Sequence, residues 1–181
     1  MPDMEPLLVI EKYYDSQSVV GQLLINHSRS VANKALAIAL AHPELHVDLQ
    51  FIAEAAMLHD IGIFLCHAPD IGCFGVSDYI CHGYLGAELL QKEGFPRHAR
   101  VCERHTGTGI TMQMITEQNL PLPLRDMIPV TLEEQIICFA DKFFSKTNPD
   151  KEKNISQIEV SLQRHGDDVV ARFKNWLSLF L

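Results

Sequence analysis

Several histidines and aspartates of this chain fall on the apolar faces or at the ends of predicted helices, and two of them, His59 and Asp60, are adjacent. An adjacent pair means little by itself, because nine histidines and eleven aspartates in 181 residues give about half such a pair by chance. The context is more informative, since the pair ends a strongly apolar segment. A charged carboxylate is costly to bury there unless it is paired or binds a metal. The sequence therefore predicts a cationic partner for Asp60.

Four further groups of the same kind lie on apolar helical faces or at the ends of such helices. They are the imidazoles of His27, His82 and His105 and the carboxylate of Asp141. Helix bundles build internal metal sites from side chains that project inward in this way. A set of histidines and aspartates without a thiolate suits iron, manganese, cobalt, nickel or zinc better than calcium or magnesium. We therefore predict a site for one or two divalent transition-metal ions.

A metal site of this composition favours hydrolysis. Two neighbouring ions clamp a transferring phosphoryl group and lower the pKa of a bound water, which generates hydroxide near neutral pH. Hydrolysis of a phosphate ester through a metal-activated water is the reaction that these residues predict.

Helical periodicity positions the first of these residues. Apolar residues at three- and four-residue steps predict an amphipathic helix over about 17–41, with His27 on its buried face. Asp48 is the expected N-cap of the next helix, which we expect to end near Gly62 in a left-handed C-cap. Residues 64–77 lack steady periodicity and are expected to form a long loop, which could lie over the site.

The middle of the chain is expected to be helical too. One helix should begin near His82 and end at Gly94, and Pro96 should open another that carries His105. After a connection interrupted by prolines, Thr131 to Glu134 has the pattern of a capping box for a helix that contains Asp141.

Residues 154–181 are expected to form two final helices that pack on the rest, the first capped by Ser156 with Glu159. The second carries an apolar face that we expect to complete the core rather than to serve as a dimer surface; this face comprises Val169, Phe173, Trp176 and Phe180. The predicted class is all-α, a helical bundle forming a single domain over residues 1–181.

Composition limits the function classes. A chain of 181 residues with 47% hydrophobic residues can bury a core, and five cysteines without a CxxC spacing argue against a disulfide framework and a zinc ribbon. A net charge of −8 with scattered basic residues argues against duplex nucleic acid as a partner. No segment has the pattern of a signal peptide or a membrane span, so we expect a cytoplasmic protein with a small substrate and no membrane partner.

The order of these residues resembles the HD superfamily in its HDIG form: His27, then His59-Asp60-Ile61-Gly62, then His82, His105 and Asp141. The local sequence agrees, since residues 82–88 resemble the His-xxx-Gly-Ala-Glu helix of the family and residues 140–142 its Ala-Asp-Lys ending. The matches span residues 27–142. The segments 103–107 and 131–134 resemble small stand-alone HDIG proteins of unassigned substrate.

The resemblance implies a helical fold, a metal-dependent phosphohydrolase activity and a role for each residue. Asp60 and His59 are the residues expected at the catalytic centre. The core ligands of the principal metal would be His27, His59, Asp60 and Asp141. His82 and His105 match an added pair that completes a second metal site in some members and holds a substrate phosphate in others. The implied substrate is a phosphate mono- or diester, such as a nucleotide or a related small metabolite.

Departures from the family's sequence pattern argue against some of its substrates. Thr106 follows His105 where some phosphodiesterase branches carry a second histidine, and no Gly-Tyr-Pro follows the HDIG segment, which disfavours cyclic-dinucleotide hydrolysis. Arg104 and Lys142 are adjacent to two ligands and are candidates for binding substrate phosphate. Two other functions stay open: a di-iron oxygenase with the same ligand set, and a nucleotide-binding regulatory module without catalysis.

Overall fold

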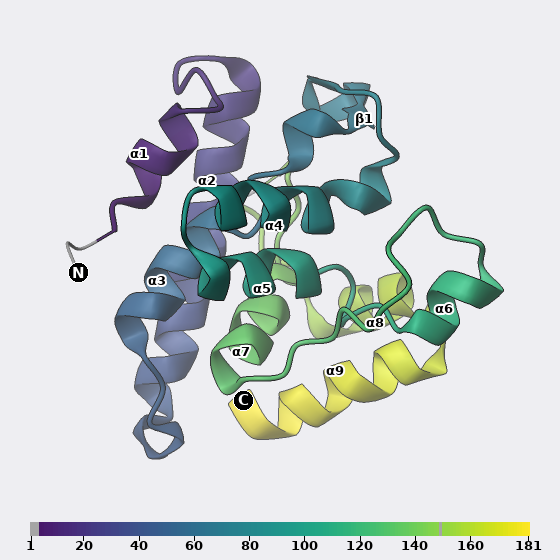
Figure 1. The fold of residues 1–181 in the computed structure, drawn as a ribbon. Coiled ribbons are helices and arrows are strands. Elements are labelled where there is room, and N and C mark those ends of the chain that lie inside the picture. The colour runs from purple at the N-terminus through teal and green to yellow at the C-terminus, as the bar shows by residue number, and fades with distance from the viewer. Residues whose placement is uncertain (1–3, 149) are drawn as a thin grey trace.

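The computed structural model describes residues 4–148 and 150–181, and α-helices make up most of this part of the chain (Figure 1). The helices are α1 (Pro6–Glu11), α2 (Val19–Ala41), α3 (Leu49–Leu58), α4 (His82–Lys92), α5 (Pro96–Arg104), α6 (Met112–Glu117), α7 (Leu132–Asp141), α8 (Ile155–Gln163) and α9 (Asp167–Phe180). Short 3-10 turns cover 43–45, 63–65, 69–71 and 79–81. The prediction of an all-α fold is confirmed.

Besides a small cluster of Ile110, Ile115 and Met127, the helices pack around two large apolar clusters. In the larger one, α2 packs against α3 and α7, and α9 covers α7 from outside. Figure 1 shows α9 along the lower edge and α4 beside α5 across the middle. Trp176 and Phe180 are 4% and 1% exposed, so the apolar face of α9 completes the core as expected. No helix among the described residues is long and apolar enough to span a membrane.

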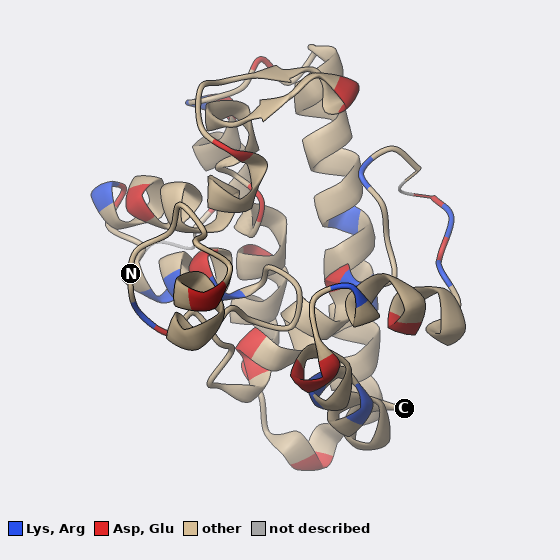
Figure 2. Ribbon diagram, turned by 90° about the vertical axis from the view of Figure 1, so that its right-hand side faces the viewer, with Lys and Arg blue, Asp and Glu red and all other residues tan. Residues whose placement is uncertain are grey.

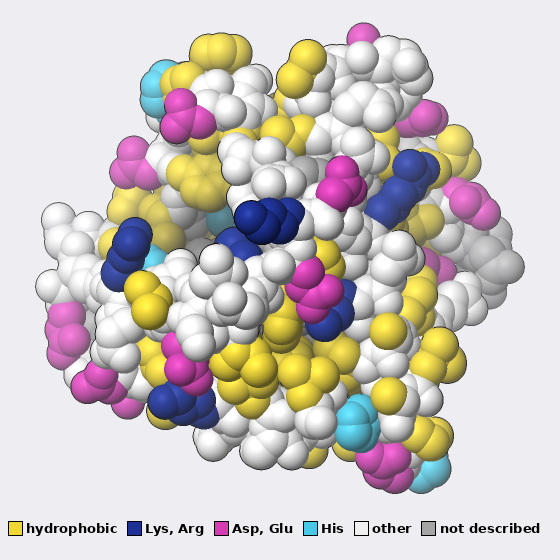
Figure 3. Space-filling view, turned by 180° about the vertical axis from the view of Figure 1, so that it is seen from behind, with side chains coloured by type: hydrophobic (Ala, Val, Ile, Leu, Met, Phe, Trp, Pro, Cys, Tyr) yellow, Lys and Arg dark blue, Asp and Glu magenta, His cyan; other side chains and the backbone are white. Residues whose placement is uncertain are grey.

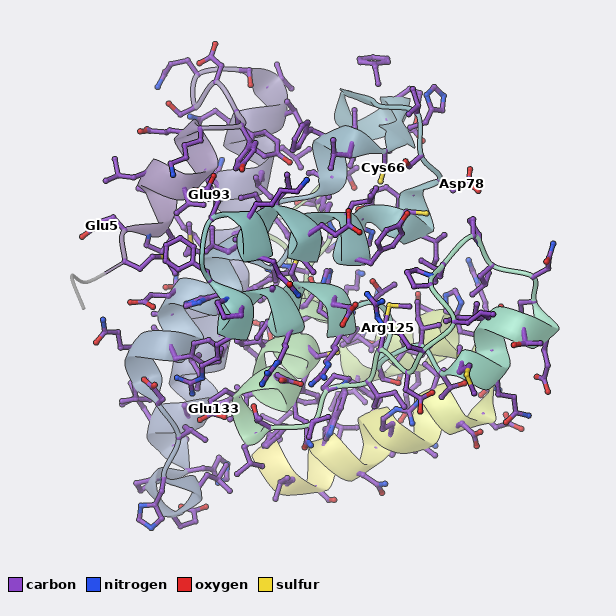
Figure 4. All side chains as sticks on the ribbon, viewed as in Figure 1. Glu5, Cys66, Asp78, Glu93, Arg125 and Glu133 are labelled. Carbon is purple, nitrogen blue, oxygen red and sulfur yellow. The ribbon has the colours of Figure 1, made fainter. Side chains whose placement is uncertain are left out.

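Two of the predicted helix starts are confirmed by their caps. The side chain of Asp48 accepts a hydrogen bond from the Phe51 N–H and begins α3. Pro96 occupies the first turn of α5. Glu133 of α7, labelled in Figure 4, accepts a hydrogen bond from the Asp48 N–H at 3.2 Å and so joins the first turns of α3 and α7.

Two predicted caps are wrong in detail. Helix α8 is capped by Asn154, which forms a reciprocal capping box with Gln157, and Ser156 lies inside the helix. An amide side chain directly before the helix satisfies the free N–H groups better than a serine already within it. At α7, Thr131 accepts the Glu134 N–H, but the Glu134 carboxylate is turned away to the Val130 N–H.

Gly62 does not form a left-handed C-cap, since its φ is −83°. The reason for glycine is close packing: a Cβ atom at this position would lie 2.3 Å from the carbonyl oxygen of His82. The absence of a side chain lets the end of α3 approach the start of α4.

The segment 64–77 contains more structure than a loop. β1 (His67–Ala68) pairs antiparallel with β2 (Cys73–Phe74), and 3-10 turns lie before and between the two strands. The stretch is therefore not the unbroken loop that its lack of periodicity predicted. Two residues per strand give too short an alternation for a sequence pattern to reveal. Helix α6, with only six residues, is a second element that the periodicity did not predict.

Candidate metal centre

Four of the predicted ligands converge from three helices. His27 lies in the middle of α2, His59 and Asp60 follow the last turn of α3, and Asp141 ends α7. The Nε2 atom of His27 is 3.0 Å from Oδ1 of Asp141 and 3.2 Å from Oδ2 of Asp60. The Nε2 atom of His59 is 3.1 Å from the same Asp60 oxygen. One ligand atom from each residue lies within 4.8 Å of the others, which is the spacing of a metal-binding group.

A second group of three shares Asp60 with the first. The Nε2 atoms of His82 and His105 lie 3.1 Å apart, and they are 3.4 and 3.2 Å from Oδ1 of Asp60. Asp60 thus presents one oxygen to each group and is completely buried between them. The sequence indicated which residues would form the site, and the structure adds that a single carboxylate joins its two halves.

Backbone hydrogen bonds orient three of the imidazoles. In each case the Nδ1 atom lies within hydrogen-bond distance of a carbonyl oxygen three residues earlier, so a proton on Nδ1 leaves the Nε2 lone pair free for a metal. The end of a helix or turn supplies such carbonyls, because they have no partner within the helix. The pairs are His59 with Ala56 (2.6 Å), His82 with Tyr79 (2.7 Å) and His105 with Cys102 (2.7 Å).

Glycines bring His82 and His105 together. A Cβ atom on Gly86 would lie 2.5 Å from Sγ of Cys102, and one on Gly83 would lie 2.9 Å from the Cys102 carbonyl oxygen. Helix α4 therefore meets the α5 backbone directly at Gly83 and the Cys102 side chain at Gly86. The predicted Gly-Ala-Glu segment of α4 thus has a structural role, which is to set the separation of two ligands.

The ionisation states of the second group suit metal binding. Burial lowers the pKa of His82 to about 3 and also lowers the pKa of His105, so both imidazoles are neutral near pH 7. Burial raises the pKa of Asp60, but the charges of Lys146 and His59 outweigh it and hold that pKa well below its usual range. A neutral imidazole and an ionised carboxylate are the forms that coordinate a cation.

The first group attracts positive charge. Burial lowers the pKa of His59, yet the carboxylates of Asp60 and Asp141 overcome burial and raise it to about 10. The Nε2 atom of His59 is completely buried and makes no well-aligned hydrogen bond to a described residue, although an Asp60 oxygen is 3.1 Å away. Two carboxylates that hold a proton on a fully buried imidazole indicate that the residues present fit a cation.

A pocket of about 480 Å³ leads to the site, and His27 and Asp141 form part of its floor. Figure 3 shows this hollow, with basic side chains at its edge and histidine atoms inside it. Ala68, Asp70 and Ile71 line its mouth, so the segment 64–77 does border the site. His67 of the same segment is exposed and does not line the pocket.

Three lysines line this pocket, namely Lys142, Lys146 and Lys153. The Lys142 ammonium is 2.8 Å from Oδ2 of Asp141 and donates to the His105 carbonyl oxygen at 3.1 Å. The Lys146 ammonium lies 2.6 Å from Oδ2 of Asp60. Lys142 was predicted as a phosphate-binding candidate, whereas Lys146 and Lys153 were not. These lysines cluster in the short stretch after Asp141, and this clustering was the only feature of the sequence that could have identified them. Helical periodicity could not predict where their side chains point, because the helix ends at Asp141.

Arg104 was predicted, like Lys142, to bind substrate, but it lies outside this pocket. Its Nη1 atom is 3.1 and 2.9 Å from the two carboxylate oxygens of Glu134, so it joins α5 to α7. His165, which fell outside the ligand pattern, does line that pocket. All five cysteines are buried and unpaired, as expected for a chain without a disulfide framework.

Residues 24–145 match the HD domain family, so the chain belongs to the HD-domain family. Its two groups of His and Asp residues are compatible with bound divalent metal. An uncharacterized protein of Methanocaldococcus jannaschii is 33% identical over 178 residues, which are 97% of this chain and 86% of that protein.

Two further relatives bear the name tRNA (cytidine(56)-2′-O)-methyltransferase. The protein of Picrophilus torridus is 33% identical over 159 residues and that of Thermoplasma volcanium is 32% identical over 144 residues. These alignments cover 87% and 79% of this chain but only 40% and 37% of the two relatives. No solved structure matches the chain.

Proposed function

We propose that this protein is a metal-dependent phosphohydrolase that cleaves a phosphate mono- or diester of a nucleotide or a related small metabolite. The observation that carries the proposal is the meeting of two features in one pocket. The floor of the pocket holds two of the predicted His and Asp ligands, and its wall holds three lysines. A cation-binding floor next to a cationic wall fits a phosphate group better than a neutral substrate.

The ligands divide the work between two positions. His27, His59, Asp60 and Asp141 would hold the principal ion, and Asp60 with His82 and His105 would hold a second. A divalent iron, manganese, cobalt, nickel or zinc ion bound there supplies Lewis acidity and lowers the pKa of a water to near neutral. Asp60 contributes to both positions, and the hydrogen bonds of the histidines keep their Nε2 atoms facing the centre.

The lysines bind and orient the phosphate. Lys142 and Lys146 are mostly buried, with 11% and 16% of their side chains exposed, and they already lie against carboxylates of the site. Their charges would neutralise a phosphoryl group drawn toward the ligand cluster. Lys153 lines the same wall farther along the chain and would contact the substrate from the side of α8.

The proposed substrate is small, and the proposed location is the cytoplasm. Figure 2 shows Lys and Arg distributed among several elements rather than gathered in a stripe along one face. Such a distribution does not provide the basic surface that duplex nucleic acid requires. A terminal phosphate on RNA is nevertheless a useful test compound, because two relatives are named for an activity on tRNA.

The test measures metal content of protein purified without added metal, then phosphate release from a panel of nucleotides, sugar phosphates, diesters and an RNA with a terminal phosphate. Asp60→Ala is compared with Asp168→Ala, which changes an exposed aspartate in the first turn of α9. We expect release by the wild type and by the Asp168 variant, and none by the Asp60 variant. Wild-type protein that binds no metal and releases no phosphate after reconstitution would refute the proposal. Metal-dependent oxygen consumption instead of phosphate release would favour the oxygenase alternative.

A further inference from the structure

The pocket lined by Lys142, Lys146 and Lys153 is called the lysine pocket below. A second pocket, of about 220 Å³, adjoins it and is mostly apolar. It lies between α6 and the first turn of α9, which Figure 1 shows close together beyond the end of α5. Its wall is mostly apolar and includes Ile80, Ile110, Met114, Leu120 and Val169. Polar groups are few, which is the usual composition of a site for a small organic group.

The two pockets share a common edge. Gly107 and His165 line both of them. Tyr79 faces the lysine pocket, while its neighbour Ile80 faces the apolar one. Because the same segments supply both walls, the pockets are neighbouring compartments rather than separate hollows.

The ridge between the compartments is bare backbone at Gly107, and His165 borders both compartments beside it. Gly107 has a φ of +60°, and a Cβ atom built on it would meet nothing within 4 Å. No side chain therefore separates the metal side from the apolar side at this point. A molecule that is longer than a phosphate can cross the ridge at Gly107.

The ridge is also held firmly. The Thr108 hydroxyl donates to the Val169 carbonyl oxygen at 3.0 Å, and Nε of Arg172 donates to the Thr108 carbonyl oxygen at 2.9 Å. On the other side, Sγ of Cys138 contacts the Gly107 carbonyl oxygen at 3.4 Å. A ligand that crosses the ridge thus meets a preformed surface and does not have to order it, which favours binding.

We infer that the apolar pocket is a specificity site that binds the non-phosphate part of the substrate, a planar ring with apolar faces, while its phosphate lies in the lysine pocket. This inference deepens the proposed function and rests on it for the position of the phosphate. The size and lining of the pocket favour one ring system, and the amide of Gln118 at its wall can bond to a polar ring edge. Nucleobases and simple aryl groups belong to this class.

The test compares the equilibrium binding of AMP with that of ribose 5-phosphate, which is the same phosphate ester without the ring. Titrations use chelator-treated protein, so that the ligand is not hydrolysed during the measurement, and phosphate release is followed in separate metal-loaded samples. We expect AMP to bind at least about tenfold more tightly, since burying a ring removes apolar surface from water. Leu120→Glu, which places a charge in the apolar wall, should abolish most of this preference. Leu124→Glu should retain it, because Leu124 belongs to the same connection but is 71% exposed and lines neither pocket.

A second pair of variants tests the ridge without changing the apolar wall. Gly107→Asn adds a side chain to the ridge, and asparagine tolerates a positive φ. Gly94→Asn is its control, with a φ of +85° and open space at Cβ in the turn after α4. Gly107→Asn should weaken AMP binding more than ribose 5-phosphate binding, and Gly94→Asn should change neither.

The outcomes separate the two proposals. Equal affinity of the wild type for AMP and ribose 5-phosphate, or an AMP preference that survives both Leu120→Glu and Gly107→Asn, overturns the ring site even if phosphate is released. A preference that depends on Leu120 and Gly107 supports the ring site. If neither compound is hydrolysed but that preference is present, the ring site stands and the hydrolase proposal fails for these esters.

Discussion

Lys146 places its ammonium 2.6 Å from Oδ2 of Asp60, the carboxylate that joins both halves of the ligand cluster. The two residues come from opposite halves of the chain, and both are largely buried. Their contact places a permanent positive charge at the point where the ligand cluster meets the substrate pocket. The same oxygen faces His27 and His59, so Lys146 is a neighbour of the metal site as well as a wall of the pocket.

The first prediction concerns Lys146. Lys146→Gln should lower kcat/KM for phosphate esters by roughly 10-fold or more, because a hydrogen bond to a charged group contributes about 1.5–3 kcal/mol. Metal content should be retained, since all six ligands remain. Steady-state kinetics and metal analysis of the same preparations check both statements. Lys151→Gln is the control, because Lys151 is exposed and does not line the lysine pocket. Unchanged kinetics in Lys146→Gln would exclude it from phosphate binding.

The second prediction separates the two ligand groups. Asp60→Asn should weaken binding of every metal ion, because Asp60 belongs to both groups, whereas His82→Ala should weaken only the ion held with His105. Titration of chelator-treated protein with manganese or zinc measures the affinities. Equal losses of all bound metal in both variants would show that the groups form one site rather than two.

The third prediction follows from the pKa values of the metal-free protein. His82 has a folded pKa of about 3, so below about 6.5 the unfolded chain takes up a proton that the folded chain excludes, and stability falls as the pH decreases from 6.5 toward 3. His59 has a folded pKa of about 10, so its contribution is fully present below 6.5 and is lost as the pH rises from 6.5 toward 10.

The free energy of unfolding of chelator-treated protein should therefore be greatest near pH 6–7 and decrease on both sides. Chemical denaturation at several pH values measures it. His59→Gln should remove the alkaline decrease, and added metal should flatten it, since a metal ion replaces the proton on His59. A stability that rises steadily from pH 6.5 to 9 in the wild type would contradict the assignment of a raised pKa to His59.

The fourth prediction tests whether Arg104 is structural or binds substrate. Arg104→Met leaves the Glu134 carboxylate, which is 4% exposed, without its cationic partner, and it should cost about 3–5 kcal/mol of stability. Replacing both residues with methionine should restore a large part of that loss. Because Arg104 does not line the lysine pocket, KM should change little in the folded double variant. A large rise in KM without loss of stability would instead support the substrate-binding role.

The burial of the candidate ligands could be predicted because that information is local, whereas their roles as ligands are what the resemblance to the HD superfamily implies. The apolar period of α2 places His27 on the buried face, and the apolar run of α3 leads directly to His59 and Asp60. The ends of helices are also local features, so Asp48 and Pro96 were found correctly. An ionised carboxylate at the buried end of a helix requires a cationic partner whatever the rest of the fold is, so this requirement can be recognised from the sequence alone.

Only the tertiary structure determined which residues these side chains contact. Arg104 and Lys142 looked alike in sequence, each adjacent to a ligand, but Arg104 meets Glu134 while Lys142 reaches the pocket. Gly62 serves close packing rather than a turn, and Lys146 reaches Asp60 after the chain has left α7. Helical periodicity fixes which face a side chain occupies, but the packing of helices distant in sequence determines what that face meets.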